Sequence, residues 1–142
     1  MKKILIINGP NLNMTGIREP GIYGNQTLSD INNMIKERAD KLNVSVEFFQ
    51  SNCEGEIIDK IHSAYNNADG IIINPGAYSH YSLAIADALR SVNIKTFEVH
   101  ISNVFKREEK RSEMVTAAAS TAVISGAGAY SYILALEGIL NV

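Results

Sequence analysis

Residues 70–82 have the sequence GIIINPGAYSHYS. Its three consecutive isoleucines predict a strand that is buried on both faces, as the inner strands of a parallel sheet are. Pro75 cannot donate a ladder hydrogen bond and Gly76 tolerates a positive φ, so the chain has to turn there. A helix is predicted next, because apolar residues then recur at helical spacing. These apolar residues are Leu83, Ile85, Ala86 and Leu89.

The turn between this strand and this helix is rich in polar side chains. It holds Asn74, Tyr78, Ser79, His80 and Ser82. Open α/β sheets bind small molecules in the crevice beyond the carboxyl ends of their strands. The turn is therefore a predicted site for a small molecule.

Strands and helices alternate along the rest of the chain. Besides 71–73, strands are predicted at 4–7, 44–49, 95–99 and 121–125. A first helix opens at Thr27 with the apolar stripe Leu28, Ile31, Met34, Ile35 and Leu42. A second follows residues 51–55, with Ile57, Ile58, Ile61, Ala64 and Tyr65 on one face, and the closing helix contains Tyr130, Ile133, Leu134 and Leu140. This alternation predicts a three-layer α/β sandwich around a parallel sheet.

Composition narrows the class of protein. The 142 residues fit a single domain, 46% of them are hydrophobic, and the net charge of −2 offers no basic excess for nucleic acid. One cysteine, Cys53, excludes an intrachain disulfide and is expected to be a buried thiol in a reducing cytoplasm. The apolar run at 4–7 is too short for a signal core or a membrane span.

Parallel strands end at one edge of their sheet, so polar residues after different strands should converge. Those residues are Asn8, Gln50, Asn74, Glu98 to His100, and Ser125. His80 and His100 both belong to this edge, whereas His62 lies within a helix and is expected to be structural or solvated. Glu98 interrupts an apolar strand and therefore needs a polar partner.

Three arginines lie in irregular segments, namely Arg18, Arg107 and Arg111. They are either solvated surface charges or an anion site that lowers the pKa of a neighbour.

Sequence motifs of several other chemistries are missing. There is no Walker A sequence, no metal-ligand spacing, and GAGAYS at 126–131 follows the last strand and lacks the final glycine of a dinucleotide fingerprint.

Five motifs run through the chain in order: GPNLN (9–13), REPGIYG (18–24), NPGAYSH (74–80), EVHISN (98–103), and REE with a further arginine (107–109 and 111). This series resembles type II 3-dehydroquinate dehydratase, at that family's spacing and over nearly the whole chain. The resemblance implies a flavodoxin-like fold with strand order 2-1-3-4-5 and one domain over residues 1–142. It also implies dehydration of 3-dehydroquinate to 3-dehydroshikimate in the shikimate pathway, without metal or organic cofactor.

The same resemblance implies catalytic roles. Tyr23 would remove a proton from the carbon next to the ketone. An ordinary tyrosine has a pKa near ~10, so Arg18, with Arg107 as an auxiliary, would have to favour its anion. Asn11 would stabilise the resulting enolate through a bound water.

His100 would then donate a proton to the departing hydroxyl, with Glu98 orienting the imidazole or balancing its charge. The substrate's carboxylate and hydroxyls would be held by Asn74, His80, the main-chain amides of Ile101 and Ser102, and Arg111. Family members assemble as trimers grouped into dodecamers, and Asp87 would reach the site of a neighbouring subunit.

This chain departs from the family pattern at a few positions: Met14-Thr15 for a leucine pair, Lys110 for an aromatic, Met114 and Ala117 for serines, and Ser131 for a glycine. None of these removes a reacting group.

The residues alone leave two other functions open. One is a flavodoxin-like module that binds FMN or another phosphorylated ligand, and the other is a catalytically silent homo-oligomer.

Overall fold

A computed structural model describes residues 1–17, 26–109 and 113–142. Within these ranges, five strands form one parallel sheet in the order β2-β1-β3-β4-β5. The strands are β1 (Lys3–Asn8), β2 (Ser45–Gln50), β3 (Gly70–Asn74), β4 (Thr96–His100) and β5 (Ala122–Ser125). The strand order and the parallel pairing confirm the predicted flavodoxin-like architecture.

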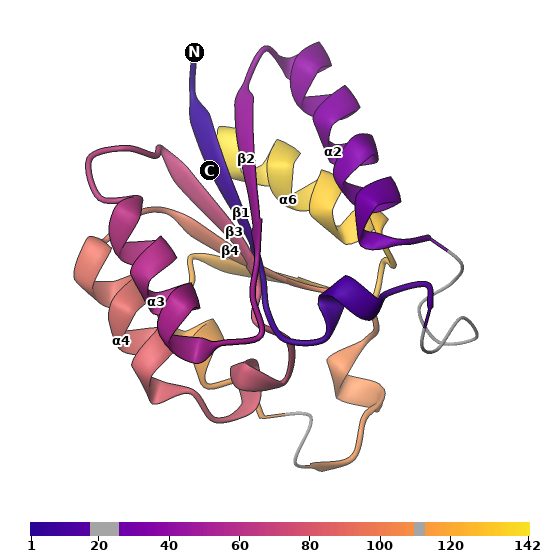
Figure 1. The fold of residues 1–142 in the computed structure, drawn as a ribbon, viewed down its shortest axis with the longest axis vertical. Helices are drawn as coiled ribbons and strands as arrows, with labels where there is room; N and C mark the ends of the chain where they lie inside the picture. Colours follow the sequence, from indigo (N-terminus) through magenta and orange to yellow (C-terminus); the bar gives the residue numbers. More distant parts are fainter. Residues whose placement is uncertain (18–25, 110–112) are drawn as a thin grey trace.

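Helices cover both faces of the sheet (Figure 1). α2 (Leu28–Leu42) and α6 (Tyr130–Asn141) pack on one face, and α3 (Glu54–Ser63) and α4 (Leu83–Val92) pack on the other. β3 contributes to both layers, because Ile72 lies in the α2 and α6 core while Ile71 and Ile73 lie in the α3 and α4 core. All three isoleucines are fully buried, as predicted for a central strand.

Side chains cap the N-terminal ends of α2 and α4. Thr27 accepts a hydrogen bond from the Asp30 amide, and the Asp30 carboxylate accepts one from the Thr27 amide, so α2 opens with a complete capping box. The C-cap residue of α2 is Asn43, which has a left-handed φ of 57°. Ser82 caps α4 by accepting from the Ile85 amide at 3.0 Å. The four short 3-10 turns described are η1 (Leu12–Met14), η2 (Gly76–His80), η3 (Val104–Lys106) and η4 (Thr116–Ala119).

Some residues that periodicity placed on packed helix faces are exposed. Tyr65 is 60% exposed, because α3 ends at Ser63 and Asn66 turns the chain away with a φ of 62°. Leu83 is 67% exposed at the first position of α4, and Leu42 is partly exposed at the last position of α2. Helical spacing identifies a face, but it does not say where a helix extends past the sheet.

Two further expectations are corrected. α6 turns Tyr132, Leu136 and Ile139 to the sheet, so Tyr130 and Leu134 lie on its outer side. Cys53 is exposed rather than buried, because it is the N-cap residue of α3 and the buried stripe of that helix begins only at Ile57.

No helix in the described ranges is long and apolar enough to cross a membrane.

Candidate active site

Every strand of the sheet ends in a polar residue, and all five ends lie at one edge. The final residues are Asn8, Gln50, Asn74, His100 and Ser125. Asn8 lies opposite both Gln50 and Asn74 in the strand register, and His100 lies opposite Ser125. The convergence predicted from the alternating pattern is therefore confirmed, and Glu98 lies two residues inside the same edge.

The loops that follow β1 and β3 press against each other. The Gly9 amide donates to the Asn74 carbonyl at 2.8 Å, and a Cβ atom on Gly9 would lie 2.4 Å from the Pro75 carbonyl oxygen. Gly76 has a φ of +60°, as expected for the turn after Pro75. This close approach fixes the start of η2, which carries His80.

Glu98, His100 and Thr116 form a buried polar cluster. Glu98 is 0% exposed, His100 2% and Thr116 0%. The Nε2 atom of His100 lies 2.7 Å from Oε2 of Glu98, and the Thr116 hydroxyl donates to Oε1 of the same carboxylate. The prediction that Glu98 needs a polar partner is confirmed. Since Glu98 engages Nε2, Nδ1 is the ring nitrogen of His100 that remains for other chemistry.

The main chain of His100 is also held in place. Its carbonyl accepts hydrogen bonds from the Ser131 hydroxyl and from the Gly126 amide, both at 3.2 Å. Ser131 therefore has a structural contact at this edge, although it replaces a glycine of the family pattern.

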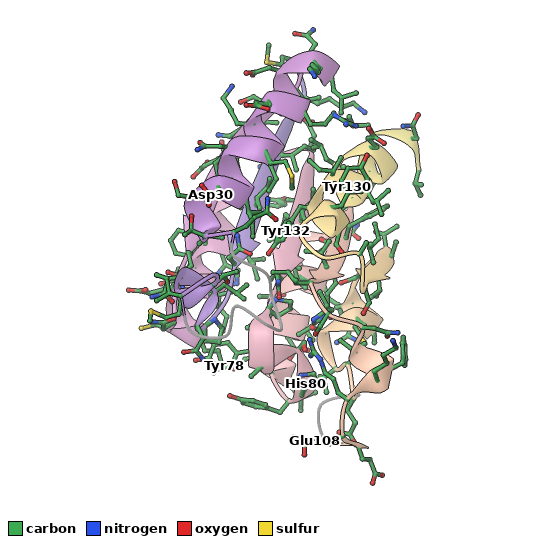
Figure 2. The ribbon with its side chains drawn as sticks, turned by 90° about the vertical axis from the view of Figure 1, so that its right-hand side faces the viewer. Asp30, Tyr78, His80, Glu108, Tyr130 and Tyr132 are labelled. Atoms are coloured by element: carbon green, nitrogen blue, oxygen red, sulfur yellow. The ribbon has the colours of Figure 1, made fainter. Side chains whose placement is uncertain are left out.

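A second buried network links α6 to the end of β1 and β3. The Tyr132 hydroxyl donates to Oδ1 of Asn8 at 2.5 Å and accepts from Nδ2 of Asn74 at 3.0 Å. Oδ1 of Asn74 accepts from the Gly76 amide at 3.1 Å. Complete burial raises the pKa of Tyr132, which keeps this phenol neutral at physiological pH. Figure 2 shows Tyr132 on the side of α6 that faces the core. The carboxamide of Asn74 is thus oriented from two sides.

His80 is held by the segment that follows residue 112. Its Nδ1 lies 2.6 Å from the Glu113 carbonyl, so Nδ1 carries the proton. The Val115 amide donates to the Ser79 carbonyl at 2.6 Å, which fixes the same segment against η2. Nε2 of His80 is buried and has no hydrogen-bond partner in the described part of the chain. In the neutral ring this atom is a hydrogen-bond acceptor.

Asn52 joins three of the loops at this edge. Its Oδ1 accepts from the Asn11 amide at 3.0 Å and from Nε2 of Gln50 at 3.2 Å. Its carbonyl accepts from the Tyr78 hydroxyl at 2.8 Å, and Figure 2 shows Tyr78 and His80 at the same end of the molecule. Asn11 itself is exposed with a left-handed φ of 69°. Asn52 was not expected as a site residue from the sequence.

The turn after β4 brings further predicted residues to this edge. Ile101 is buried, and its carbonyl accepts from the Gly128 amide at 3.0 Å. The Ser102 hydroxyl accepts a hydrogen bond from the guanidinium of Arg107. Arg107 is therefore not simply a solvated charge, since it reaches back to the turn that follows His100.

Asp87 is placed apart from this cluster within one chain. It lies on the exposed side of α4, where its carboxylate is 3.5 Å from the guanidinium of Arg90. His62 is exposed in the last turn of α3. Arg18, Tyr23 and Arg111 lie outside the described residues.

Besides Asn52, two residues of this edge were not expected as site residues from the sequence. Thr116 stands in the run Val-Thr-Ala-Ala-Ala, where its hydroxyl is the sole polar side-chain group. Tyr132 lies in the closing helix α6. Each reaches its partner only through tertiary packing. In residues 1–17, 26–109 and 113–142, no three His, Cys, Asp or Glu side chains are grouped as a metal site would require.

Comparison with known proteins decides the family. The model of the family described as "Dehydroquinase class II" matches residues 2–140. The chain belongs to this family. A relative from Caldanaerobacter subterraneus subsp. tengcongensis, described as a 3-dehydroquinate dehydratase, is 59% identical over 139 residues, covering 98% of this chain and 94% of the relative. One from Clostridium botulinum strain Hall, with the same description, is 58% identical over 141 residues, covering 99% and 96%.

Solved structures agree with this membership. The type II dehydroquinase from Butyrivibrio crossotus has a TM-score of 0.97 at 55% identity, covering 99% of this chain and 98% of that one. The type II dehydroquinase from Propionibacterium acnes has a TM-score of 0.94 at 42% identity, with 98% and 96% covered. The chain is therefore a type II dehydroquinase by family and by fold, and an enzyme of the hydro-lyase class.

Proposed function

We propose that this dehydroquinase converts 3-dehydroquinate to 3-dehydroshikimate through an enolate, with Tyr23 as the base and His100 as the acid. The family membership supports the dehydration reaction. The observation that carries the assignment of the acid is the buried pair of Glu98 and His100, with 2.7 Å between Oε2 and Nε2. The protein is expected to act in the cytoplasm, where its reaction is one step of the shikimate pathway.

The first step removes the proton from the carbon next to the ketone. The Tyr23 phenolate accepts this proton, and the electron pair moves onto the ketone oxygen to give an enolate. Arg18 favours the phenolate by its positive charge. Asn11, whose amide is tied to Asn52, faces the developing oxyanion through a bound water.

The second step expels the hydroxyl group. The enolate pair re-forms the ketone, a carbon–carbon double bond forms, and the carbon–oxygen bond breaks. His100 gives a proton from Nδ1 to the departing oxygen, which leaves as water. The carboxylate of Glu98 stabilises the charged imidazole through Nε2 and holds the ring in one orientation. A positioned acid of this kind contributes roughly 10²–10⁴-fold to a rate.

Substrate binding uses the rest of the edge. The Nδ2 atom of Asn74 and the main-chain amides of Ile101 and Ser102 are donors suited to a carboxylate. Nε2 of His80 accepts a hydrogen bond from a substrate hydroxyl, since Nδ1 already donates to Glu113. Arg111 adds a positive charge, and Arg107 supports the turn at Ser102.

The assembly is proposed to be a dodecamer built from trimers, with Asp87 entering a neighbouring site. Its support is the outer face of α4, where Asp87 is exposed and Leu83, one helical turn earlier, is 67% exposed. Tyr81, just before the helix, is 62% exposed. Large exposed apolar side chains beside a functional carboxylate fit a subunit interface. Light scattering tests this, and a fully active monomer of 15.5 kDa would contradict the shared site.

The reaction is tested by adding 3-dehydroquinate and following the ultraviolet absorbance of the conjugated enone. The expected result is a rise in absorbance that is unaffected by EDTA and by borohydride added with the substrate, because no metal ion or Schiff base takes part. Tyr23→Phe keeps the ring but removes the proton acceptor, so it should lower kcat by roughly 10²-fold or more. Inactivation by borohydride trapping would instead indicate a lysine Schiff base.

A further inference from the structure

The carboxylate of Glu98 depends on two partners, and one of them is not a titratable group. Oε2 lies 2.7 Å from His100 Nε2, and Oε1 accepts from the Thr116 hydroxyl. The Glu98 side chain is fully buried in the strand, so an oxygen without a partner would carry a large desolvation cost. Thr116 therefore satisfies the half of the carboxylate that His100 cannot reach.

The Thr116 hydroxyl is itself held at a fixed position. Thr116 is 0% exposed at the start of η4. The amide of the preceding residue, Val115, donates to the Ser79 carbonyl at 2.6 Å, and the Ser120 hydroxyl donates to the Thr116 carbonyl at 3.2 Å. The donor is thus anchored on both sides before it meets Glu98.

Fixing one carboxylate oxygen fixes the direction of the other. The terminal torsion of a glutamate is broad and roughly twofold, so the carboxylate plane is not set by rotamer preference. With Oε1 held by Thr116, Oε2 is aimed at His100 and the imidazole ring is held with it. Without the Thr116 hydroxyl, the carboxylate is free to rotate and the ring loses its fixed partner.

We propose that Thr116 is a positioning residue for His100, which it controls through the carboxylate of Glu98. The proposal rests on the proposed function, in which His100 is the acid. The short segment that contains Thr116 also holds His80 through the Glu113 carbonyl. Residues 113–116 thereby support both imidazoles of the site.

The test compares variants that separate the hydroxyl from the shape of the side chain. Thr116→Val removes the donor and keeps the volume, and Thr116→Ser keeps the donor. Thr96→Val is the matched control, because Thr96 is also buried, lies at the other end of β4, and donates its hydroxyl to the Ile94 carbonyl at 2.9 Å. Each variant is measured for kcat and KM with 3-dehydroquinate, alone and in the His100→Ala background.

Thr116→Val is expected to lower kcat by roughly 10–100-fold, the usual effect of a misplaced catalytic group. KM should stay within about twofold, since an interaction made in the transition state is lost. Thr116→Ser should restore most of the rate, and Thr96→Val should leave it unchanged. In the His100→Ala background, Thr116→Val should have little further effect, because its partner is already gone.

An equal loss from Thr116→Val with and without His100 would overturn the proposal, because a merely structural defect lowers both rates. If the valine variant does not fold, Thr116→Cys replaces it. A thiol is a weak donor, so kcat should fall in the order Thr, Ser, Cys, and equal rates for all three would also overturn it.

A crystal structure of Thr116→Val gives a result that does not depend on turnover. The Glu98 carboxylate should be turned and the His100 ring displaced. A Glu98 and His100 pair unchanged from that of the wild type would contradict the role of Thr116. Absence of turnover by the wild-type chain would contradict the proposed function instead, so the two failures are distinguishable.

Discussion

Replacing Tyr132 with phenylalanine removes one hydroxyl from the centre of the molecule and leaves two buried carboxamides short of a partner. The hydroxyl donates to Asn8 and accepts from Asn74, and both asparagines are at least 97% buried. A buried polar group without its partner costs about 1–3 kcal/mol. With two such groups, Tyr132→Phe should lower the free energy of unfolding by about 2–6 kcal/mol.

The assay is thermal unfolding at one fixed protein concentration, because the proposed assembly would make Tm depend on concentration. For a chain of this length, each kcal/mol lowers Tm by roughly 3–4 °C. Tyr65→Phe is the control, since Tyr65 is 60% exposed, and it should change stability by less than about 0.5 kcal/mol. An equally small change in Tyr132→Phe would refute the claim that this hydroxyl holds the two asparagines.

The same residue gives a prediction for alkaline pH. Burial raises the pKa of Tyr132 in the folded state above the ordinary value of about 10. Its contribution is complete below the unfolded pKa and is lost as pH rises from there toward the folded pKa, because only the unfolded chain releases the proton. Wild type should therefore lose stability above about pH 10 by up to ~1.4 kcal/mol per pH unit more than Tyr132→Phe does.

Three further predictions concern other parts of the chain. Thr27→Ala removes one half of the α2 capping box and should lower the free energy of unfolding by about 1 kcal/mol in urea denaturation. A hydrogen bond from Lys60 lowers the pKa of the Glu47 carboxyl, so Glu47→Gln should lower the free energy of unfolding at neutral pH. The loss should be less than about 1 kcal/mol, because the pair is partly exposed, and it should shrink in high salt. The stability difference between wild type and variant is fully present above the ordinary carboxyl pKa and disappears as pH falls through the lowered pKa. Arg18→Gln should lower kcat at neutral pH and recover part of it as pH rises, because hydroxide then supplies the Tyr23 phenolate; an equal loss at every pH would mean that Arg18 acts by positioning.

Much of the fold follows from local patterns. The isoleucine run of β3, the cap at Thr27 and the turn at Pro75 each predict the structure found there. The polar edge follows from the rule that parallel strands end together, which brings Asn8, Asn74 and His100 to one edge. These features depend on residues close in sequence or on a general property of sheets.

What the sequence could not predict depends on tertiary packing. The hydrogen bond from Thr116 to Glu98 joins residues 18 positions apart, and that from Tyr132 to Asn8 joins residues 124 apart. No periodicity marks either pair. The exposure of Leu83 and Tyr65 was missed for a related reason, because the length of a helix relative to its sheet is not encoded in the spacing of its apolar residues.

The proposed role of His100, held by Glu98, as the acid that protonates the departing hydroxyl is tested by comparing kcat and KM of His100→Ala with those of His62→Ala. The His100 side chain is 2% exposed and contacts Glu98, whereas His62 is exposed on α3. His100→Ala should lower kcat by roughly 10²–10⁴-fold with KM changed only modestly, and His62→Ala should change neither. Equal losses in the two variants, or a full rate in His100→Ala, would contradict this role of His100.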